Sequence, residues 1–292
     1  MAREFQDCGH TVCSAVPLST VTSFRIGGPA DYLVEPRSVD ELARLVDRCM
    51  ARDIPVRVLG AGSNLLVADA GVRAAVFRLS RLTAVRRAGS RVTCEAGLPL
   101  PRLVRKAEEW GLSGLEPLAG IPGSVGGAIA MNAGGRNGCV ANALRSVTTI
   151  DRYGFLRART PRRLGMRYRE SRLKPEIAVA ATFELEEADP AEVTERRRAV
   201  LDEKSRTQPL GAWSAGCVFK NAAERSAGEL IERAGLKGER VGHAVVSTRH
   251  ANFIINEGNA TARDVRALID RVRRGVRQSF GVGLDLEIEM WN

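Results

Sequence analysis

The order of apolar and polar residues predicts alternating helices and strands along the chain. Residues 38–53 predict a helix, because Ser38 is a suitable N-cap, Glu41 completes a capping box, and apolar side chains then recur on one face. Residues 265–276 show the same periodicity, whereas residues 284–291 alternate apolar and mostly acidic side chains, as a half-buried strand does. Apolar runs predict a buried strand at 56–60, short β-structure around Gly71 within 65–79, strands at 92–97, 144–151 and 177–186, and two short strands within 245–256. Start and stop signals predict further helices at 101–111, 189–209 and 226–235.

A domain boundary is predicted between Ala188 and Asp189. Asp189, Pro190 and Glu192 form a strong helix start, with a cap, a proline at the first helical position and an acid two residues later. The helix that follows is highly charged, as a connector on the surface would be. The chain is therefore expected to divide into an N-terminal segment (1–22), a first domain (23–188) and a second domain (189–292).

The composition is typical of a globular protein, with 44% hydrophobic and 27% charged residues. No stretch reaches the roughly 20 apolar residues that a membrane-spanning helix needs, and the start of the sequence has no signal-peptide pattern, so we expect a cytoplasmic protein. The six cysteines form no C-x-x-C pair and are expected to be free thiols. Cys8, His10 and Cys13 lie close together but lack a fourth ligand, so we do not expect a metal.

The formal net charge of +10 favours anionic partners. Aromatic residues make up only 5% of the chain and do not alternate with basic ones, so nucleic acid is not the expected ligand. Phosphate-bearing cofactors and nucleotide sugars fit the charge better.

Two glycine-rich stretches are candidate phosphate-binding loops. In residues 60–66, GAGSNLL, a predicted strand runs into glycines whose amides form a nest, although an ordinary tight turn explains the pattern equally well. No G-x-G-x-x-G fingerprint is present. Residues 119–135, AGIPGSVGGAIAMNAGG, are more specific, because Pro122 could begin a short helix with free N-terminal amides. Either these loops hold a long diphosphate cofactor at two points, or the second is a tightly packed crossing without a ligand.

Three other positions are candidates for chemistry. Cys217 lies in a small-residue turn and is either a core thiol or a proton carrier. Arg169, in MRYRES, could bind a carboxylate through two parallel hydrogen bonds, although a Tyr-Arg pair is usually a surface feature. Glu287 lies on the polar side of the last predicted strand, where a solvated acid is the ordinary reading. The histidines, including His243 and His250, form no hydrolase motif.

Seven stretches occur in one order along the chain, followed by an acid near the C-terminus: SFRIGGPADYLVEP (23–36), GAGSNLLV (60–67), LEPLAGIPGSVGGAIAMNAG (115–134), RYRES (167–171), SAGCVFKN (214–221), SAGELIERAGLKG (226–238) and HANFIINEGNAT (250–261). Together they resemble the UDP-N-acetylenolpyruvoylglucosamine reductases, flavoenzymes of peptidoglycan precursor synthesis. The resemblance covers nearly the whole chain. The short connection after residue 171 is similar to the second type of the family, which lacks an extra loop over the substrate.

The resemblance implies an α+β fold. The first part would be a FAD-binding domain of two α+β subdomains, of the PCMH or vanillyl-alcohol-oxidase type, followed by a smaller α+β substrate-binding domain. FAD would be bound non-covalently. The implied FAD-binding residues are Arg25, Gly60, Ala61, Gly62, Ser63, Asn64, Leu65, Gly120, Ile121, Pro122, Gly123, Ser124, Gly127, Ala128, Asn132, Ala133 and Gly134.

The implied reaction is reduction of UDP-N-acetylglucosamine enolpyruvate by NADPH through FAD. Arg169 matches the residue that stabilises an enolate-like state, Glu287 an assisting acid, and Cys217 the position of the proton donor, which is serine in most members. Compared with a serine hydroxyl, a thiol, with a pKa of about 8.5, is the stronger acid but the weaker hydrogen-bond donor. Substrate contacts are implied for Tyr168, Arg206, Gln208, Lys220 and Asn221.

Two further departures from the family pattern, His243 and Ala222, remove no implied catalytic group. The expected protein is a monomer with a small-molecule substrate, without nucleic acid or membrane as partner. The alternatives are another FAD-dependent oxidoreductase or oxidase of the same fold, a flavin- or nucleotide-binding protein without turnover, and a basic nucleic-acid binder.

Overall fold

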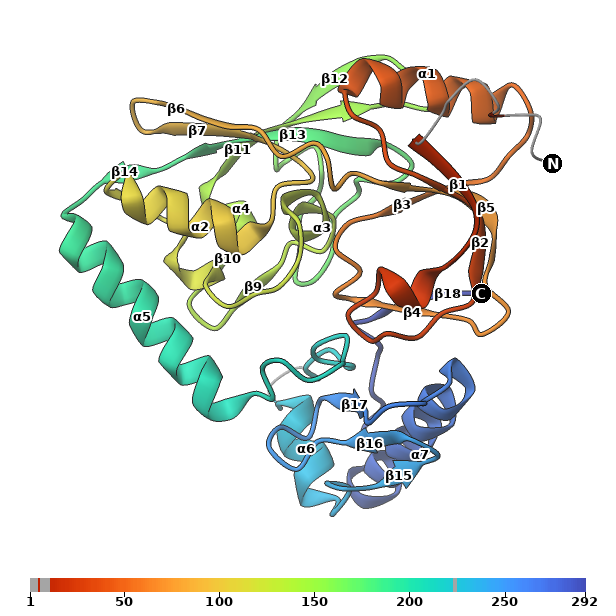
Figure 1. Ribbon diagram of the computed structural model, residues 1–292. Helices are drawn as coiled ribbons and strands as arrows, with labels where there is room; N and C mark the ends of the chain where they lie inside the picture. Colours follow the sequence, from red (N-terminus) through yellow and green to blue (C-terminus); the bar gives the residue numbers. More distant parts are fainter. Residues whose placement is uncertain (1–4, 6–10, 223–224) are drawn as a thin grey trace. The chain divides into compact units, whose positions relative to one another are not determined.

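The computed structural model describes residue 5, residues 11–222 and residues 225–292 (Figure 1). Cys8 and His10 lie outside these residues. The chain forms two compact units, and their boundaries fall inside strands β1, β2 and β5 and helix α5. The boundary predicted at 188/189 stays a prediction. The first unit contains residues 1–14, 31–61 and 73–203, and the second contains residues 15–30, 62–72 and 204–292.

The first unit is built on a five-stranded antiparallel sheet with the order β12-β11-β13-β7-β6. Helices α2 and α3 pack together on the same side of this sheet, and α3 contacts β13 (Figure 1). The predicted start of α2 is confirmed, with Pro101 in its first turn and Gly111 just beyond its end at a φ of +62°. These elements are β6 (Val85–Ala88), β7 (Arg91–Glu95), α2 (Leu100–Glu109), α3 (Val125–Ala130), β11 (Leu144–Ile150), β12 (Leu156–Arg159) and β13 (Ile177–Glu184).

A second sheet has four strands in the order β1-β2-β5-β3. Helix α1 (Val39–Met50) lies between β2 and β3 in the sequence. Ser38 caps α1 by accepting a hydrogen bond from the Glu41 amide, as predicted. The prediction of a buried strand at 56–60 is wrong, because β3 is an edge strand and Val58 is 40% exposed. The strands are β1 (Val12–Pro17), β2 (Pro29–Val34), β3 (Val56–Leu59) and β5 (Val72–Arg78).

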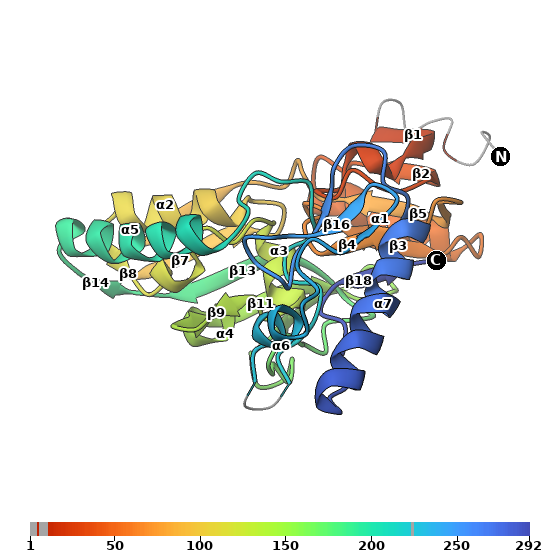
Figure 2. The same ribbon diagram turned by 90° about the horizontal axis from the view of Figure 1, so that it is seen from below.

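The second unit has its own apolar core, formed by a three-stranded sheet, β15-β16-β17, and two helices. Helix α7 (Ala262–Phe280) packs on β15, β16 and α6 through the predicted apolar stripe, which is buried from Val265 to Val276 (Figure 2). The C-terminal strand β18 pairs in parallel with β4. The other elements are β4 (Leu65–Val67), α6 (Ala227–Arg233), β15 (Arg240–Val241), β16 (Ala244–Val246), β17 (Ile254–Asn256) and β18 (Glu289–Trp291).

Helix α5 (Pro190–Thr207) begins where the sequence predicted. Val193 is its single buried residue, and ion pairs from Arg196 to Glu116 and from Arg197 to Glu108 attach it to the first unit. None of the helices in the described ranges is both long and apolar enough to cross a bilayer. The remaining short elements are η2 (Leu18–Thr20), β8 (Leu112–Ser113), η3 (Glu116–Leu118), β9 (Gly134–Gly135), β10 (Gly138–Cys139), α4 (Val140–Ala143) and β14 (Glu186–Glu187).

Candidate functional site

The predicted site residues divide between the two units. Each unit is described by itself below. The first unit contains Gly60, Ala61, Gly120, Ile121, Pro122, Gly123, Ser124, Gly127, Ala128, Asn132, Ala133, Gly134, Tyr168 and Arg169. The second contains Arg25, Gly62, Ser63, Asn64, Leu65, Arg206, Gln208, Cys217, Lys220, Asn221 and Glu287.

In the first unit the two glycine-rich loops lie against each other. A Cβ atom added to Gly60 would lie 2.5 Å from the Ser124 hydroxyl oxygen and 3.8 Å from the Cα of Gly127. Ser124 cannot easily move away, because its hydroxyl caps α3 by accepting a hydrogen bond from the Gly127 amide. Glycine at position 60 therefore allows the end of β3 to approach the start of α3.

The prediction that Pro122 begins a helix with free amides is wrong. Helix α3 begins at Val125, and its first amides are already used by protein acceptors. Val125 donates to the Leu98 carbonyl and Gly126 to the Ala96 carbonyl, at 2.9 and 2.7 Å. These bonds fasten the helix to the segment that follows β7, so its N-terminus does not offer those amides to a ligand.

The loop before α3 has the amides that the helix lacks. Within residues 11–222 and 225–292, the backbone amides of Gly120, Gly123 and Ser124 donate no hydrogen bond to the protein. The same holds for the amides of Gly62 and Asn64 in the second unit. Backbone amides that converge without protein acceptors are the donors that bind phosphate oxygens. In each unit taken by itself, the loop offers amides of the kind that bind phosphate oxygens, whereas the start of α3 does not.

Glu116 fixes the approach to the second glycine-rich loop. It is 6% exposed and accepts hydrogen bonds from the Ser113 hydroxyl, the Gly114 amide and Arg196, at 2.8, 2.6 and 3.1 Å. Burial alone would raise the pKa of the Glu116 carboxyl, but these hydrogen bonds and one from its own amide hold the pKa below its ordinary value. A charged Glu116 thus anchors η3 directly before the loop.

Arg169 lies in a tight turn that is fastened to the end of α3. Arg167 and Glu170 exchange backbone hydrogen bonds around it, and Arg169 has a φ of +55°, which is uncommon for a non-glycine residue. The buried Asn132 side chain donates to the Arg167 carbonyl at 2.9 Å, and Ser171 donates to the Ala130 carbonyl at 2.8 Å. Asn132, a predicted FAD-binding residue, therefore also positions the turn of the predicted catalytic arginine.

In the second unit the first glycine-rich loop is connected to the Glu287 segment. The Asn64 side chain donates to the Glu287 carbonyl at 3.0 Å, and the Asn64 carbonyl accepts from the Glu289 amide at 2.9 Å. Gly62 has a φ of +65°, and a Cβ there would lie 2.5 Å from the Val21 carbonyl oxygen. The loop 62–65 and residues 287–289 are therefore held as one assembly.

The extended Cys217 segment (residues 217–219) lies between two neighbouring segments in the second unit. Glu287 donates its amide to the Val218 carbonyl, and Cys217 forms a bridge with Phe253 on the other side. The Asn252 side chain, 3% exposed, accepts from the Phe219 amide and donates to the Phe219 carbonyl, at 2.9 and 2.8 Å. This bracket fixes the backbone two residues after the predicted proton donor.

The cysteines differ in exposure. Cys94 is 2% exposed in β7, and burial, with a smaller effect of the Glu95 charge, raises the pKa of its thiol to about 12. Such a thiol cannot exchange a proton readily at neutral pH. Cys217 is only partly buried, and it lies two residues before the Phe219 backbone that the Asn252 side chain holds. The environment of Cys217 thus differs from that of an inert core thiol.

The predicted substrate-binding residues have structural contacts of their own. The Lys220 amide donates to the Asp285 carbonyl, and the Asn221 side chain accepts from the first amide of α6, that of Ala227. Arg206 lies in the last turn of α5, and the carbonyl of Gln208, just beyond it, accepts a hydrogen bond from Arg249. Tyr168 is 53% exposed, and the Arg169 guanidinium lies 5.2 Å from its ring centre.

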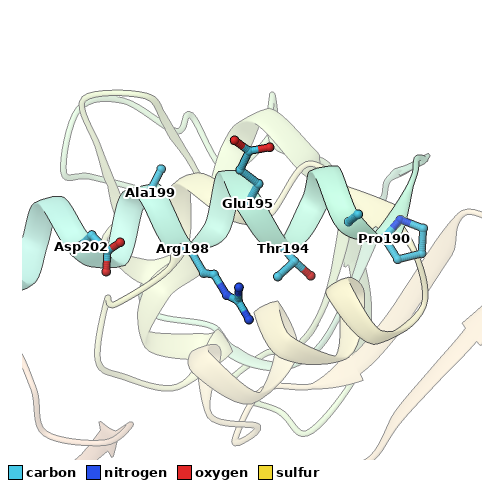
Figure 3. Close-up of a pocket in the computed structure, with 7 residues that line it drawn as sticks. Pro190, Thr194, Glu195, Arg198, Ala199 and Asp202 are labelled. Atoms are coloured by element: carbon cyan, nitrogen blue, oxygen red, sulfur yellow. The ribbon is translucent and has the colours of Figure 1, made fainter.

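A hollow of about 550 Å³ on the surface of the first unit does not coincide with these residues (Figure 3). Its lining comes from a single helix, α5, and contains none of the predicted site residues. The lining residues are Pro190, Ala191, Thr194, Glu195, Arg198, Ala199 and Asp202.

Sequence reasoning missed three side chains that organise the second unit. Asn252 and Asn256 are buried, and both lie within residues 245–256, where the sequence predicted strands but no role for either asparagine. Trp213, just before the Cys217 turn, stacks on Arg25. Two asparagines inside an apolar run are a usable signal, because a buried amide must be hydrogen-bonded.

Comparison with known proteins assigns both parts of the chain. Residues 30–158 match the model described as FAD binding domain. Residues 208–291 match the model described as UDP-N-acetylenolpyruvoylglucosamine reductase, C-terminal domain.

Relatives match over nearly their whole length. UDP-N-acetylenolpyruvoylglucosamine reductase 2 of Symbiobacterium thermophilum is 46% identical, over 95% of this chain and 91% of the relative. The reductase of Moorella thermoacetica is 44% identical, over 94% of this chain and 91% of the relative. The crystal structure of UDP-N-acetylenolpyruvylglucosamine reductase from Thermus caldophilus superimposes with a TM-score of 0.85 at 41% identity, covering 96% of this chain and 98% of that one.

The amide-rich loops and the matched FAD-binding domain define the class of the protein as a FAD-dependent oxidoreductase. The predicted α+β fold, a FAD-binding domain followed by a smaller domain, is confirmed. Within that class, the chain belongs to the UDP-N-acetylenolpyruvoylglucosamine reductase family.

Proposed function

We propose that this protein reduces the enolpyruvyl ether of UDP-N-acetylglucosamine to UDP-N-acetylmuramate, with NADPH as the electron source. The proposal rests on relatives more than 40% identical over at least 94% of the chain, and on the FAD-binding and C-terminal domains that match. The glycine-rich loops 60–65 and 120–134 would hold FAD, which would supply hydride transfer between NADPH and the terminal carbon of the enolpyruvyl group. The protein must then stabilise negative charge next to the carboxylate and supply one proton.

Arg169 would bind the substrate carboxylate through its planar fork and stabilise the developing enolate. Its fixed turn, fastened through Asn132 and Ser171, supports this role, because a preorganised cation needs no rearrangement during the reaction. Glu287 would assist by orienting the carboxyl group. The substrate contacts would come from Tyr168, Arg206, Gln208, Lys220 and Asn221.

Cys217 would donate the proton to the carbon next to the carboxylate, where the family commonly has serine. The observation that carries the proposal is one hydrogen-bonded network in the second unit. It joins the 62–65 loop, the Cys217 segment and the Glu287 segment through Asn64 and the Val218 backbone. A cofactor loop, a partly exposed thiol and an acid are thereby built into a single scaffold.

The division at residues 188 and 189 belongs to the same proposal, with residues 23–188 holding FAD and residues 189–292 holding substrate. We also propose that the protein acts in the cytoplasm as a monomer.

The test separates the two halves of the reaction. Protein purified with FAD is mixed anaerobically with NADPH, and loss of the flavin absorbance is followed. Enolpyruvyl-UDP-N-acetylglucosamine is then added, and the absorbance should return with formation of UDP-N-acetylmuramate. UDP-N-acetylglucosamine, which lacks the enolpyruvyl group, is the control and should leave the flavin reduced. Reoxidation by oxygen but not by the enolpyruvyl substrate would instead identify an oxidase of the same fold.

A further inference from the structure

The segment that contains Arg25 is held in an unusual conformation. Arg25 has a φ of +54°, and it is one of five non-glycine residues with positive φ in the described part of the chain. Two of the others, Asn132 and Arg169, are also predicted site residues. The Arg25 turn is closed by a hydrogen bond from its amide to the Thr22 carbonyl and by one from the Thr22 hydroxyl to the Ile26 carbonyl. Strain that the surroundings maintain in this way is typical of functional positions.

The Arg25 guanidinium lies on the face of Trp213, 4.1 Å from the ring centre. Within the described residues, no carboxylate forms an ion pair with Arg25. A carboxylate partner would occupy the donor edge of the guanidinium through two parallel bonds. An aromatic face instead attracts the positive charge and leaves the N–H groups at the edge available. The stack therefore fixes the cation without using its donors.

Asn256 fixes both members of the stack through their backbones. Its side chain, 4% exposed in total, donates to the Phe24 carbonyl at 2.9 Å, and its amide donates to the Trp213 carbonyl at 2.8 Å. The same turn reaches the first glycine-rich loop, because the Ser23 amide donates to the Gly62 carbonyl at 3.0 Å. Arg25 is thus held beside the loop whose Gly62 amide has no acceptor in the described protein.

We propose that Trp213 is a positioning residue, which holds the Arg25 guanidinium in place for a phosphate oxygen of FAD. The inference rests on the proposed function, since it takes Arg25 as a contact of the cofactor. The indole acts through Arg25 and makes no demand on its own N–H group. The contact between Trp213 and Asn256 uses the backbone alone, so removal of the indole leaves that connection intact.

The test is the affinity of the apoprotein for FAD, measured by titration. Trp213→Ala should weaken binding about fivefold to tenfold, the range expected for a cation–π contact that is partly exposed. Trp213→Phe, which retains an aromatic face, should stay within about threefold of the wild type. In an Arg25→Met background, Trp213→Ala should cause no further loss, because the residue through which it acts is gone.

The emission of Trp213 gives a second readout. It is obtained as the difference between the wild type and Trp213→Phe, and it should fall when FAD binds. Phe280→Ala, which removes the stack of Phe280 with Arg233 in the same unit, is the matched control and should leave FAD affinity unchanged.

Equal FAD affinity in the wild type and Trp213→Ala would overturn the inference, and so would additive losses in the double variant, which indicate a general structural effect. Neither result would touch the proposed function, provided the wild type binds FAD and is reoxidised by the enolpyruvyl substrate. A wild type that binds no FAD would defeat the proposed function itself.

Discussion

The two units hold their site residues by different means. In the first unit the loops are placed by missing side chains: Gly60 lets β3 approach the Ser124 hydroxyl, and backbone hydrogen bonds to Leu98 and Ala96 fasten the start of α3. In the second unit the corresponding work is done by amide side chains. Asn252 brackets the Phe219 backbone, and Asn64 binds the Glu287 carbonyl.

The difference matches what the two kinds of segment are proposed to hold. A diphosphate is recognised by backbone amides, so the chain must come close to it and side chains are in the way. A proton donor and a carboxylate must instead be held as side chains at fixed positions. The Cys217 segment, whose Phe219 backbone is held by the buried Asn252 side chain, supplies such a fixed base.

Replacement of Cys217 is the most direct test of the proton donor on the segment that the Asn252 side chain holds in place. Cys217→Ala should slow reoxidation of the reduced enzyme by enolpyruvyl substrate by about 10²- to 10⁴-fold, the usual contribution of a positioned general acid. Reduction of the flavin by NADPH should be unchanged, because no proton donor to carbon is needed there. Stopped-flow measurement of the two half-reactions separates these effects.

Cys217→Ser is the matched control for the thiol. A hydroxyl is smaller and a weaker acid, but it occupies the same position, so much of the reoxidation rate should remain. If Cys217→Ala turned over at the wild-type rate, Cys217 could not be the donor.

The next largest effect is expected from loss of the Asn252 bracket. Asn252→Ala leaves the buried amide and carbonyl of Phe219 without partners, which should cost roughly 3 kcal/mol of stability. The melting temperature of the apoprotein should fall clearly below that of Asn259→Ala, a change of an exposed asparagine nearby. Similar melting temperatures for the two variants would show that solvent or neighbouring groups replace the bracket.

This comparison also explains what the sequence could predict. Helix α1 was predicted from its cap and apolar periodicity and helix α7 from periodicity alone; both signals are local, and the structure has the helices where expected. The glycine-rich loops were recognisable for the same reason. Asn252 and Asn256 are visible in the sequence as two asparagines inside an apolar run, but their partners are not, because Phe219 is 33 positions from Asn252.

The failures have a similar origin. Pro122 resembles a helix start, but the amides of α3 were claimed by Leu98 and Ala96, more than 25 positions earlier. The exposure of β3 depends on its place at the edge of a sheet, which the run 56–60 does not reveal. The second unit collects residues 15–30 and 62–72 with the C-terminal part, an arrangement set by tertiary packing.

A methyl group added at Gly60 tests the close packing of the glycine-rich loops in the first unit. Gly60→Ala would place a Cβ 2.5 Å from the Ser124 hydroxyl, which cannot turn away without releasing the Gly127 amide. We expect FAD affinity to fall about tenfold, or about 1.4 kcal/mol. Gly135→Ala is the matched control, since nothing lies within 4 Å of its added Cβ, and the apoprotein should bind FAD as the wild type does. Equal affinities in the two variants would mean that the loops can separate without loss.

The smallest effect should come from His250, whose ring supports the Asn252 segment of the second unit. Its Nδ1 accepts the Asn252 amide at 3.3 Å, and the ring packs on Phe253. Burial, assisted by the Lys237 charge, lowers the pKa of His250 below its ordinary value of 6.5. The unfolded chain therefore takes up a proton at a pH where the folded protein does not, so stability should decline as the pH falls below 6.5 and stop declining once the folded form is also protonated.

Melting temperatures measured across this range give the slope. His250→Asn keeps an oxygen near the position of Nδ1 but does not titrate, so it should flatten the slope while holding the Asn252 amide. His243→Asn, at an exposed position, is the matched control. If the pH dependence of the melting temperature survived in His250→Asn but disappeared in His243→Asn, it would belong to the exposed His243 ring. The His250 contact with Asn252 would then not depend on pH.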